Sequence, residues 1–540
     1  MTDTTLWLPL ALTMPGALLL LCLFPSARAR MPRLTVVAPI PTLAAALLAA
    51  RDTSVTHTAH FFHAVLALDV AGTMLLAATA MLWICAALYA VAEMRGAPNA
   101  GNFSAWWLTA MFGNFGIFLS ADLASFYLFL AVGTIGAYGL IIHTLTPDAR
   151  RASVTYVGFA LVGESSILIG LVLLATVAPG NSLLIRDAVA GLSTSPWRDL
   201  TIAFLVLGFS LKIGLVPLHL WMPLAYTAAP IPAAAVLSGA AVNAGVIGLI
   251  RFMPFDGGSA NIGAVLATVG IVSTFYGVAV GINRANPKSV LAYSSVSQMG
   301  VIATLIGTGL ATANAGVAVA AAFYAAHHAL VKGGLFLATG IGVSGKRDEW
   351  LVFVPAVIIA LGLAGLPLTG GYLAKEAVKP FIGEGTFAVF AALSSAGTTL
   401  LMLFFMKRLS DAPPDQKATQ ISLRLLTPWL AAAFFAIAIP WLLLLPLYAR
   451  PLFEASSLAD TWSTIWPILV GVALVVLWLR HGRQPREIDV TAEANFIRRV
   501  TSTCTSFFER AEVTLGQWQA GGVSLLVVTL VLTVILATGH

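Results

Sequence analysis

The sequence predicts an all-α polytopic membrane protein. Of its 540 residues, 59% are hydrophobic and only 10% are charged, a composition that soluble globular domains do not show. About sixteen apolar segments approach the roughly 20 residues that a helix needs to cross a bilayer, so we expect about 14–16 transmembrane helices. The segments are 6–24, 34–50, 67–94, 103–121, 125–144, 154–178, 200–217, 233–252, 260–282, 289–308, 315–341, 352–373, 385–407, 424–446, 461–480 and 521–538.

The net charge of +6 does not indicate a nucleic acid partner, because the basic residues are concentrated in alternate loops. This distribution instead predicts the topology of the chain in the membrane. With the N-terminus outside, alternate loops hold 20 Lys and Arg residues and the opposite loops hold six. The positive-inside rule then predicts a multi-pass protein of the inner (plasma) membrane with both termini on the non-cytoplasmic side. The larger set is Arg28, Arg30, Arg33, Arg95, Arg150, Arg151, Arg284, Lys288, Lys346, Arg347, Lys407, Arg408, Lys417, Arg424, Arg480, Arg483, Arg486, Arg498, Arg499 and Arg510.

Cofactor motifs are missing from the sequence. Cys22, Cys85 and Cys504 are scattered and form neither a metal-ligand spacing nor a disulfide framework. Residues 340–346 (GIGVSGK) imitate a phosphate-binding loop, but Arg347 stands where serine or threonine is required, and a helix end precedes the motif in place of a strand. We expect no cofactor and no catalytic site of the chain's own. The first apolar segment lacks a preceding basic stretch, so we expect a retained helix.

Three histidines occur together in residues 51–66. His57, His60 and His63 follow the spacing i, i+3, i+6, which would bring them near one face of a helix, where they could bind zinc. No carboxylate or cysteine completes the ligand set. We therefore favour a short amphipathic helix on the outer surface.

A lysine interrupts the apolar segment 200–217. Lys212 would cost about 2.5–3.5 kcal/mol at the centre of a spanning helix, so it needs a polar partner or water. Pro217 follows about a turn later and breaks the helix, which leaves carbonyl groups to be satisfied by water or side chains. His219 comes directly after the break. The three residues predict a polar pocket at mid-membrane depth.

Two further polar side chains occur in neighbouring spans. Glu164 in segment 154–178 would either pair with a lysine or stay neutral and hydrogen-bonded to the next helix. Asn243 in segment 233–252 could bond across helices as structural support or lie on a transport pathway.

Segment 315–341 contains titratable groups on one helix face. His328 and Lys332 are four residues apart and therefore stack, whereas His327 points about 100° away. A single buried histidine is usually a satisfied core residue. Paired with Lys332, His328 favours a proton relay, because histidine can both accept and release a proton.

The break near Lys212 has a counterpart five spans later. GLVPLHLW at 214–221 compares with GLPLTGGY at 365–372, which is followed by Lys375 and Glu376. Matching interrupted helices in two halves are typical of inverted repeats around a midplane site. We expect two inverted five-helix repeats, each with a broken helix. The predicted parts are N-terminal transmembrane helices (1–100), a first inverted repeat (101–255), a second inverted repeat (256–410), and C-terminal helices with a cytoplasmic-face amphipathic segment (411–540).

Four motifs in one order resemble the antiporter-like subunits of respiratory complex I, Mrp-type sodium/proton antiporters and membrane-bound hydrogenases. They are PLHLWMPLAYTAAPIPAAAVLSGAAVNAGVIGLIR, LAYSSVSQMG, HHALVKGGLFLATG and GLPLTGGYLAKE. The resemblance covers about residues 100–410. It implies fourteen or more helices and a proton path along a central line of lysines, histidines and glutamates. Lys212 and Lys375 would be the lysines of the two broken helices, and His328 and Lys332 would belong to the relay.

The sequence departs from this family at two positions. The family usually has a glutamate in the fifth span and often a lysine in the eighth, and Ala131 and Asn243 stand at the aligned positions. Either Glu164 substitutes from the next helix, or the first half-channel is altered or inactive.

The expected function is proton translocation, with or without cation antiport, by a subunit of a multi-subunit oxidoreductase or antiporter complex. Its partners would be sister membrane subunits, protons, sodium where antiport occurs, and lipid. The alternatives are the membrane subunit of a two-component inorganic-carbon uptake system and a non-conducting scaffold with a degenerate first half-channel. The candidate pathway residues are Lys212, His219, Glu164, Asn243, His327, His328, Lys332, Lys375 and Glu376.

Overall fold

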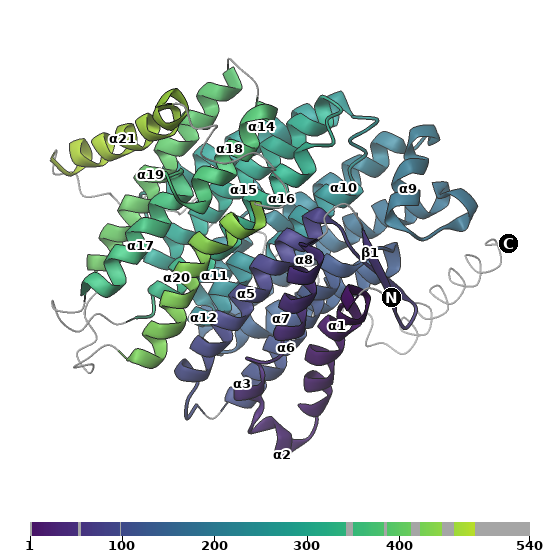
Figure 1. Cartoon of the computed structure of the whole chain (residues 1–540), viewed down its shortest axis with the longest axis horizontal. Helices are drawn as coiled ribbons and strands as arrows, with labels where there is room; N and C mark the ends of the chain where they lie inside the picture. The colour runs from purple at the N-terminus through teal and green to yellow at the C-terminus, as the bar shows by residue number, and fades with distance from the viewer. Residues whose placement is uncertain are drawn as a thin grey trace. The chain divides into compact units, whose positions relative to one another are not determined.

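The computed structural model describes residues 3–51, 56–97, 99–341, 349–382, 386–411, 422–444 and 458–480. Within these ranges the chain is almost wholly helical (Figure 1), and nine helices are long and apolar enough to cross a membrane by length and composition. The helices are α1 (Asp3–Leu21), α2 (Pro25–Arg28), α3 (Met31–Leu34), α4 (Ile40–Ala49), α5 (Val70–Glu93), α6 (Ala100–Leu119), α7 (Leu123–Ile142), α8 (Pro147–Val177), α9 (Ile185–Gly191), α10 (Arg198–Ile213), α11 (Trp221–Ala228), α12 (Ile231–Val236), α13 (Asn243–Phe252), α14 (Ala260–Gly281), α15 (Pro287–Ala311), α16 (Val317–Ala338), α17 (Glu349–Ala364), α18 (Gly370–Ile382), α19 (Thr386–Asp411), α20 (Leu423–Leu444) and α21 (Leu458–Arg480).

The all-α membrane fold is confirmed, and most predicted spans coincide with helices. The segment 34–50 is an exception, because its continuous helix is only the ten-residue α4. Pro39 and Pro41 explain the difference, since proline lacks the amide that would extend a helix through this stretch. The predicted last span, 521–538, and the amphipathic segment 481–520 lie outside the described residues.

The predicted helix around the three histidines is wrong. Residues 57–68 form an antiparallel hairpin of β1 (His57–Phe61) and β2 (Ala64–Leu68). Strand β2 bonds to the residues just before α7, since the Val65 amide donates to Asp122 Oδ2 at 2.9 Å and the Val65 carbonyl accepts from the Ala121 amide at 2.8 Å. These tertiary bonds override the local spacing. The zinc alternative assumed the same helix and loses its geometric basis.

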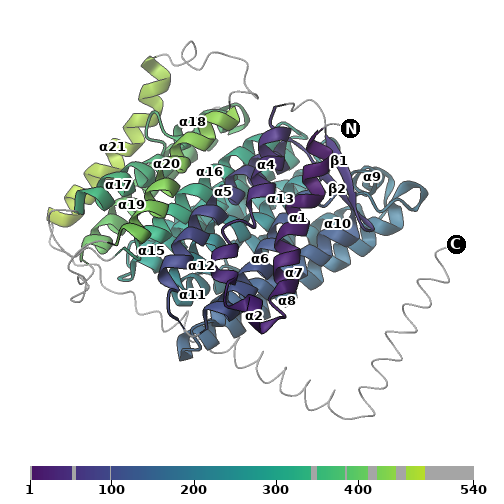
Figure 2. The ribbon, with the colours of Figure 1, turned by 60° about the horizontal axis from the view of Figure 1, so that its bottom comes forward.

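Two helix pairs of similar construction occur in the two halves of the chain. α6 packs along α7, and α14 packs along α15. Both pairs depend on glycines, since a Cβ at Gly113 would lie 2.3 Å from the Gly133 nitrogen, and one at Gly270 would lie 2.6 Å from the Gly300 oxygen. Such close backbone approach through small residues is typical of membrane helix packing. In both views, α9 and α10 lie on one side of these helices and α17 and α19 on the other (Figure 1, Figure 2).

Both predicted helix breaks are present, and each begins at a glycine. α10 ends at Gly214 (φ 71°), and α17 ends at Gly365 (φ 102°). In both, the amide after the glycine donates to a carbonyl five residues earlier at 3.1 Å, the wrapped end of a Schellman motif. Pro217 and Pro367 follow inside the breaks. The glycines therefore end the helices, and the prolines keep them from resuming at once.

Arg251 near the end of α13 holds three helices together at one end of the molecule. Its guanidinium donates to the carbonyls of Ile117, Phe118 and Ser120 at 3.2, 2.7 and 2.9 Å. It also lies 3.3 Å from the carboxylate of Asp69, which caps the start of α5. A cation at the carbonyl end of α6 is favourable because that end carries partial negative charge.

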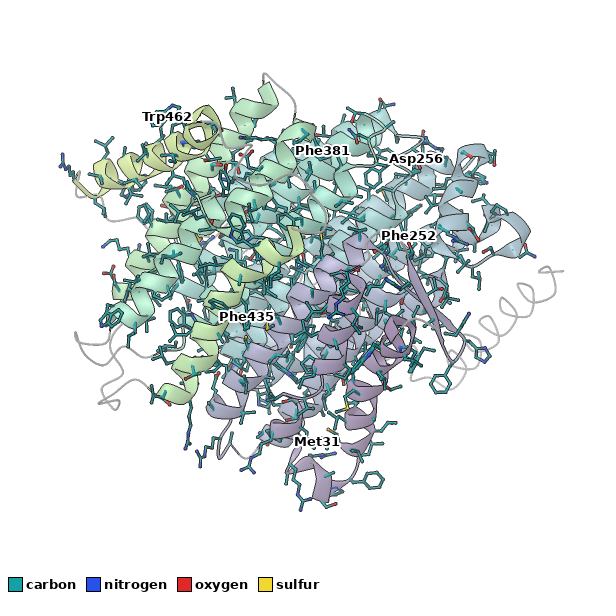
Figure 3. The ribbon with its side chains drawn as sticks, viewed as in Figure 1. Met31, Phe252, Asp256, Phe381, Phe435 and Trp462 are labelled. Carbon is teal, nitrogen blue, oxygen red and sulfur yellow. The ribbon has the colours of Figure 1, made fainter. Side chains whose placement is uncertain are left out.

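Connections between successive helices lie at opposite ends of the helices. Figure 3 shows Asp256, Phe381 and Trp462 toward one end and Met31 at the opposite end. The predicted topology places the first three in or beside outer loops and Met31 in an inner loop, so this separation agrees with the expected alternation of spans.

Candidate functional site

The centre of the first half is an ion pair between α8 and α10. Lys212 Nζ lies 3.0 Å from Glu164 Oε1 and 2.6 Å from Thr134 Oγ1, and the Thr134 hydroxyl bonds to the same carboxylate oxygen. The Lys212 and Glu164 side chains are only 13% and 10% exposed. The predicted pairing of Glu164 with Lys212 is confirmed. A carboxylate from α8 and a hydroxyl from α7 thus supply the partners that Ala131 and Asn243 do not.

A small cavity continues from Lys212 toward the middle of the molecule. It measures about 30 Å³, and its mostly apolar lining includes Lys212, Asn114, Tyr156 and Tyr226. This volume suits about one water molecule, and the polar side chains of the lining offer hydrogen-bonding partners. On the far side, Asn114 Nδ2 donates to the Ala240 carbonyl at 3.1 Å.

Ala240 belongs to a π-helical turn, Leu237–Ala241, between α12 and α13. The wider turn leaves carbonyls outside the α-helical pattern, and they accept from side chains. Asn243 Nδ2 donates to the Gly239 carbonyl at 2.8 Å and reaches the Ala325 carbonyl of α16 at 3.5 Å. Ser238 Oγ lies 3.0 Å from Ser295 Oγ of α15. The turn therefore carries polar contacts from both halves of the chain.

Lys332 lies fully buried on α16, on the other side of this turn. Its Nζ donates to the Leu291 carbonyl of α15 at 3.0 Å, and the Ser295 hydroxyl donates to the same carbonyl at 3.2 Å. One turn before Lys332 lies His328, also fully buried, whose ring nitrogens have no hydrogen-bond partner among the described residues. A buried imidazole in this position can bond to water.

A second polar group spans α15, α16 and α19. The Tyr324 hydroxyl donates to Gln298 Oε1 at 2.7 Å, and Gln298 Nε2 donates to Thr398 Oγ1 at 3.0 Å. Tyr324 precedes His328 by one helical turn, and Thr398 follows Ser395 by three residues on α19, so both ends of the group face further site residues.

Lys375 lies at the second break. Its Nζ donates to the Ala364 carbonyl at the end of α17 and to the Ser395 hydroxyl. Among the described residues no carboxylate pairs with Lys375, and Glu376 instead pairs with Lys379 one turn along α18. The first broken helix thus holds its lysine beside an anion, and the second beside neutral oxygens.

The remaining candidate residues surround the two breaks. The His219 ring is buried between α14 and α15, 4.9 Å from the ring of Tyr276. His327 lies against the second break, where a Cβ at Gly371 would come within 2.9 Å of its Nε2. Glu376 differs from the other candidates, since it pairs with Lys379 of its own helix and with no other site residue among the described ones.

The sequence prediction missed Thr134, Asn114, Ser395 and the pair Tyr324–Gln298 as site residues. Hydroxyl and amide side chains are common in membrane helices, where they bond to their own backbone. The density of polar side chains at 294–298 is the one usable signal, because it indicates contact with water or with another polar helix.

This fold and site define a class of multi-pass membrane proteins in which lysines sit beside broken helices and other buried polar groups. Residues 120–407 match the family described as NADH:quinone oxidoreductase/Mrp antiporter, TM. The chain belongs to this family.

Its relatives and structural neighbours agree with that assignment. The chain is 28% identical to NADH-quinone oxidoreductase subunit N of Desulforudis audaxviator over 64% of its own length and 72% of the relative's. It is 28% identical to Na(+)/H(+) antiporter subunit A1 of Staphylococcus haemolyticus over 65% and 49%. An uncharacterised protein of Mycobacterium tuberculosis is 35% identical, but the match spans only 42% of this chain and 38% of that protein.

Solved structures share the fold. The structure of the Mrp complex from Dietzia contains a chain with a TM-score of 0.65 and 22% identity, covering 88% of this chain and all of that one. A chain of the membrane-bound sulfane sulfur reductase, an archaeal respiratory membrane complex, gives a TM-score of 0.71 at 18% identity and covers 98% of this chain and all of that one.

Proposed function

We propose that this chain translocates protons as a membrane subunit of a larger complex of the complex I or Mrp type. The observation that carries the proposal is a series of buried polar groups from Glu164 to Lys375, which we call the central polar line. Its members are Glu164, Thr134, Lys212, Asn114, Ser238, Ser295, Lys332, His328, Tyr324, Gln298, Thr398, Ser395 and Lys375. Buried ionisable side chains in membrane helices mark ion pathways because their insertion is otherwise costly.

The contacts within the central polar line suit stepwise proton transfer. Lysine and histidine can release and accept protons, and the hydroxyl and amide groups between them can orient water or pass hydrogen bonds. The line crosses from the first half to the second at the π-helical turn, through Ser238 and Ser295. A scaffold with a degenerate first half would have no need of the Glu164–Lys212 pair, which supports conduction in both halves.

The partners follow from the names of the relatives, which are subunits of oxidoreductase or antiporter complexes. We infer that sister membrane subunits contact this chain. The topology belongs to the same proposal: Met31 would face the cytoplasm, and Asp256, Phe381 and Trp462 would face the opposite side.

Proton flux across vesicles tests the proposal without knowledge of the driving reaction. The chain, purified with its co-purifying partners, is reconstituted into liposomes that contain a pH-sensitive dye, and a potassium diffusion potential is imposed. Lys332→Met and Lys375→Met should each abolish flux, because each removes an ionisable group from the central polar line.

The matched control is Lys407→Met. Lys407 pairs with Asp411 near the exposed end of α19, so its loss should leave flux unchanged while removing the same charge. Size-exclusion chromatography checks that every variant still assembles. Unchanged flux in both Lys332→Met and Lys375→Met would contradict the proposal.

A further inference from the structure

A hollow of about 1610 Å³ opens at the end of the molecule that contains α2 and α3. It is enclosed by the α2–α3 segment, the last turn of α5, the loop after it, the first residues of α6 and the first turns of α20. None of its lining residues belongs to the central polar line, so the hollow is a separate feature of the molecule.

The polar lining of the hollow is strongly basic. No carboxylate is among the described lining residues. The lining contains five arginines, which are Arg28, Arg30, Arg33, Arg95 and Arg424. Glu93, which lies between the lining residues Ala92 and Met94 in the sequence, interacts instead with the charge of Lys288 and the backbone of Ile231. The five positive charges in the hollow are therefore not neutralised by an acidic lining residue, and they attract an anion.

Helix termini add to this attraction. α6 begins at Ala100 and α20 at Leu423, and the first residues of both line the hollow. The amino end of a helix carries partial positive charge and free amide donors, and Asn99 does not cap α6 with its side chain. Gly101 lets Arg28 approach α6, since a Cβ there would lie 2.6 Å from Arg28 Cγ.

The remaining wall is apolar and continues along the membrane helices. Leu88 and Val91 of α5 and Ala431 of α20 line the hollow, and Leu88 is 43% exposed. A small soluble anion would make no apolar contact with this wall, whereas a lipid combines a charged headgroup with apolar chains. Basic pockets between transmembrane helices recognise anionic lipid headgroups in this way.

We propose that the hollow is a binding site for an anionic phospholipid. The arginines and helix termini hold its phosphate, and its acyl chains lie along Leu88, Val91 and Ala431. This site does not depend on proton translocation, so either proposal can fail while the other stands.

Native mass spectrometry of the purified full chain, with lipids added at equal concentration, tests the site. The probes are cardiolipin, phosphatidylglycerol and phosphatidylcholine. The test variant is Arg33→Gln, Arg95→Gln, Arg424→Gln, which leaves Arg28 in place because Arg28 Nε donates to the Cys22 carbonyl. Near an anionic lipid each basic side chain contributes roughly fivefold in affinity, so the triple variant should retain the two anionic lipids on the order of 100-fold less.

The matched control is Arg150→Gln, Arg151→Gln, Arg480→Gln. These arginines are exposed, belong to the same set of predicted inner loops and lie outside the hollow. The control should bind anionic lipid as the parent does, and the melting temperature of both variants checks folding. Equal lipid loss in both triple variants would overturn the site, as would binding of phosphatidylcholine as strong as that of the anionic lipids.

Inorganic phosphate separates a lipid from a soluble anion. We expect anionic lipid, but not inorganic phosphate at about 10 mM, to raise the melting temperature of the parent chain, because a ligand stabilises the folded state to which it binds. Equal stabilisation by phosphate alone would overturn the lipid assignment and identify a soluble anion site.

Discussion

Each of the two broken helices has a buried lysine beside it, and the two lysines are stabilised by different partners. In the first, Lys212 lies in the last turn of α10 and pairs with Glu164 at 3.0 Å. In the second, Lys375 follows the break on α18, and its Nζ reaches back to the Ala364 carbonyl at the end of α17 and to Ser395. Each lysine thus belongs to a helix that stops at a left-handed glycine or lies beside its end, but only the Lys375 ammonium bonds to a carbonyl there.

The difference shows that a helix end can take the place of a counter-ion. The last carbonyls of a helix carry partial negative charge because no amide follows to bond with them. The break at Gly365 exposes such carbonyls beside Lys375. Lys212 pairs with the carboxylate of Glu164, so this site contains two opposite charges that stabilise each other. The Lys375 site contains one charged group, the lysine itself, beside neutral oxygens.

The largest effect is expected from splitting the first pair. Lys212→Met or Glu164→Gln leaves a buried polar partner unpaired and should lower the free energy of unfolding by about 3 kcal/mol. Each should also impair proton flux. The double variant should be no worse than the worse single variant, because members of one interacting pair are not additive. Thermal unfolding in detergent and flux in liposomes measure both quantities.

Additive losses in the double variant would mean that Lys212 and Glu164 act separately. If neither single variant reduced flux, the first half would be structural and only the second would conduct.

The glycines of the two breaks should differ in their tolerance of alanine. Gly365→Ala forces a side chain onto φ 102° and brings Cβ to 2.8 Å from Lys375 Cδ, so we expect a loss of about 2–3 kcal/mol and reduced flux. Gly214→Ala adopts φ 71°, and the nearest atom to its Cβ is at the flexible end of Met222, so we expect a loss of about 1 kcal/mol in stability and unchanged flux.

Thermal unfolding and flux of the two glycine variants are compared side by side. Equal flux would show that the position of the Lys375 side chain does not matter for transport.

The hydroxyl groups beside the two lysines should also differ in their effects. Thr134→Val removes a bond to each member of the charged pair and should cost about 2 kcal/mol, whereas Thr134→Ser should restore stability. Ser395→Ala should cost about 1 kcal/mol, because Lys375 keeps the Ala364 carbonyl. A larger loss from Ser395→Ala than from Thr134→Val, measured by thermal unfolding, would reverse the comparison.

The sequence was sufficient for the features that depend on strong local signals. An apolar run of spanning length predicts a helix wherever it occurs, and a lysine inside such a run predicts a polar partner, so the helices and the Glu164–Lys212 pair could be anticipated. The paired breaks were also predictable, because glycine and proline act on the backbone directly.

The features that could not be predicted from the sequence depend on contacts between distant segments. The hairpin at 57–68 is held by Asp122 and Ala121, and nothing in its local spacing reveals them. The partners of Lys332 and Lys375 include backbone carbonyls, which every residue possesses and no sequence pattern marks. The π-helical turn at 237–241 leaves a similarly weak signal, since its sequence LSGAA consists of residues that are common in packed membrane helices.

Arg251 has a consequence for how the protein is made. It bonds to Asp69, a residue 182 positions earlier in the chain, and to the carbonyls that end α6. During synthesis these oxygens enter the membrane region long before their donor exists, and they must be solvated by water or lipid headgroups in the meantime. The arrival of α13 is therefore the step that closes this end of the first half, and a chain truncated before Arg251 should leave the insertion machinery with α5 and α6 not yet fastened to each other there.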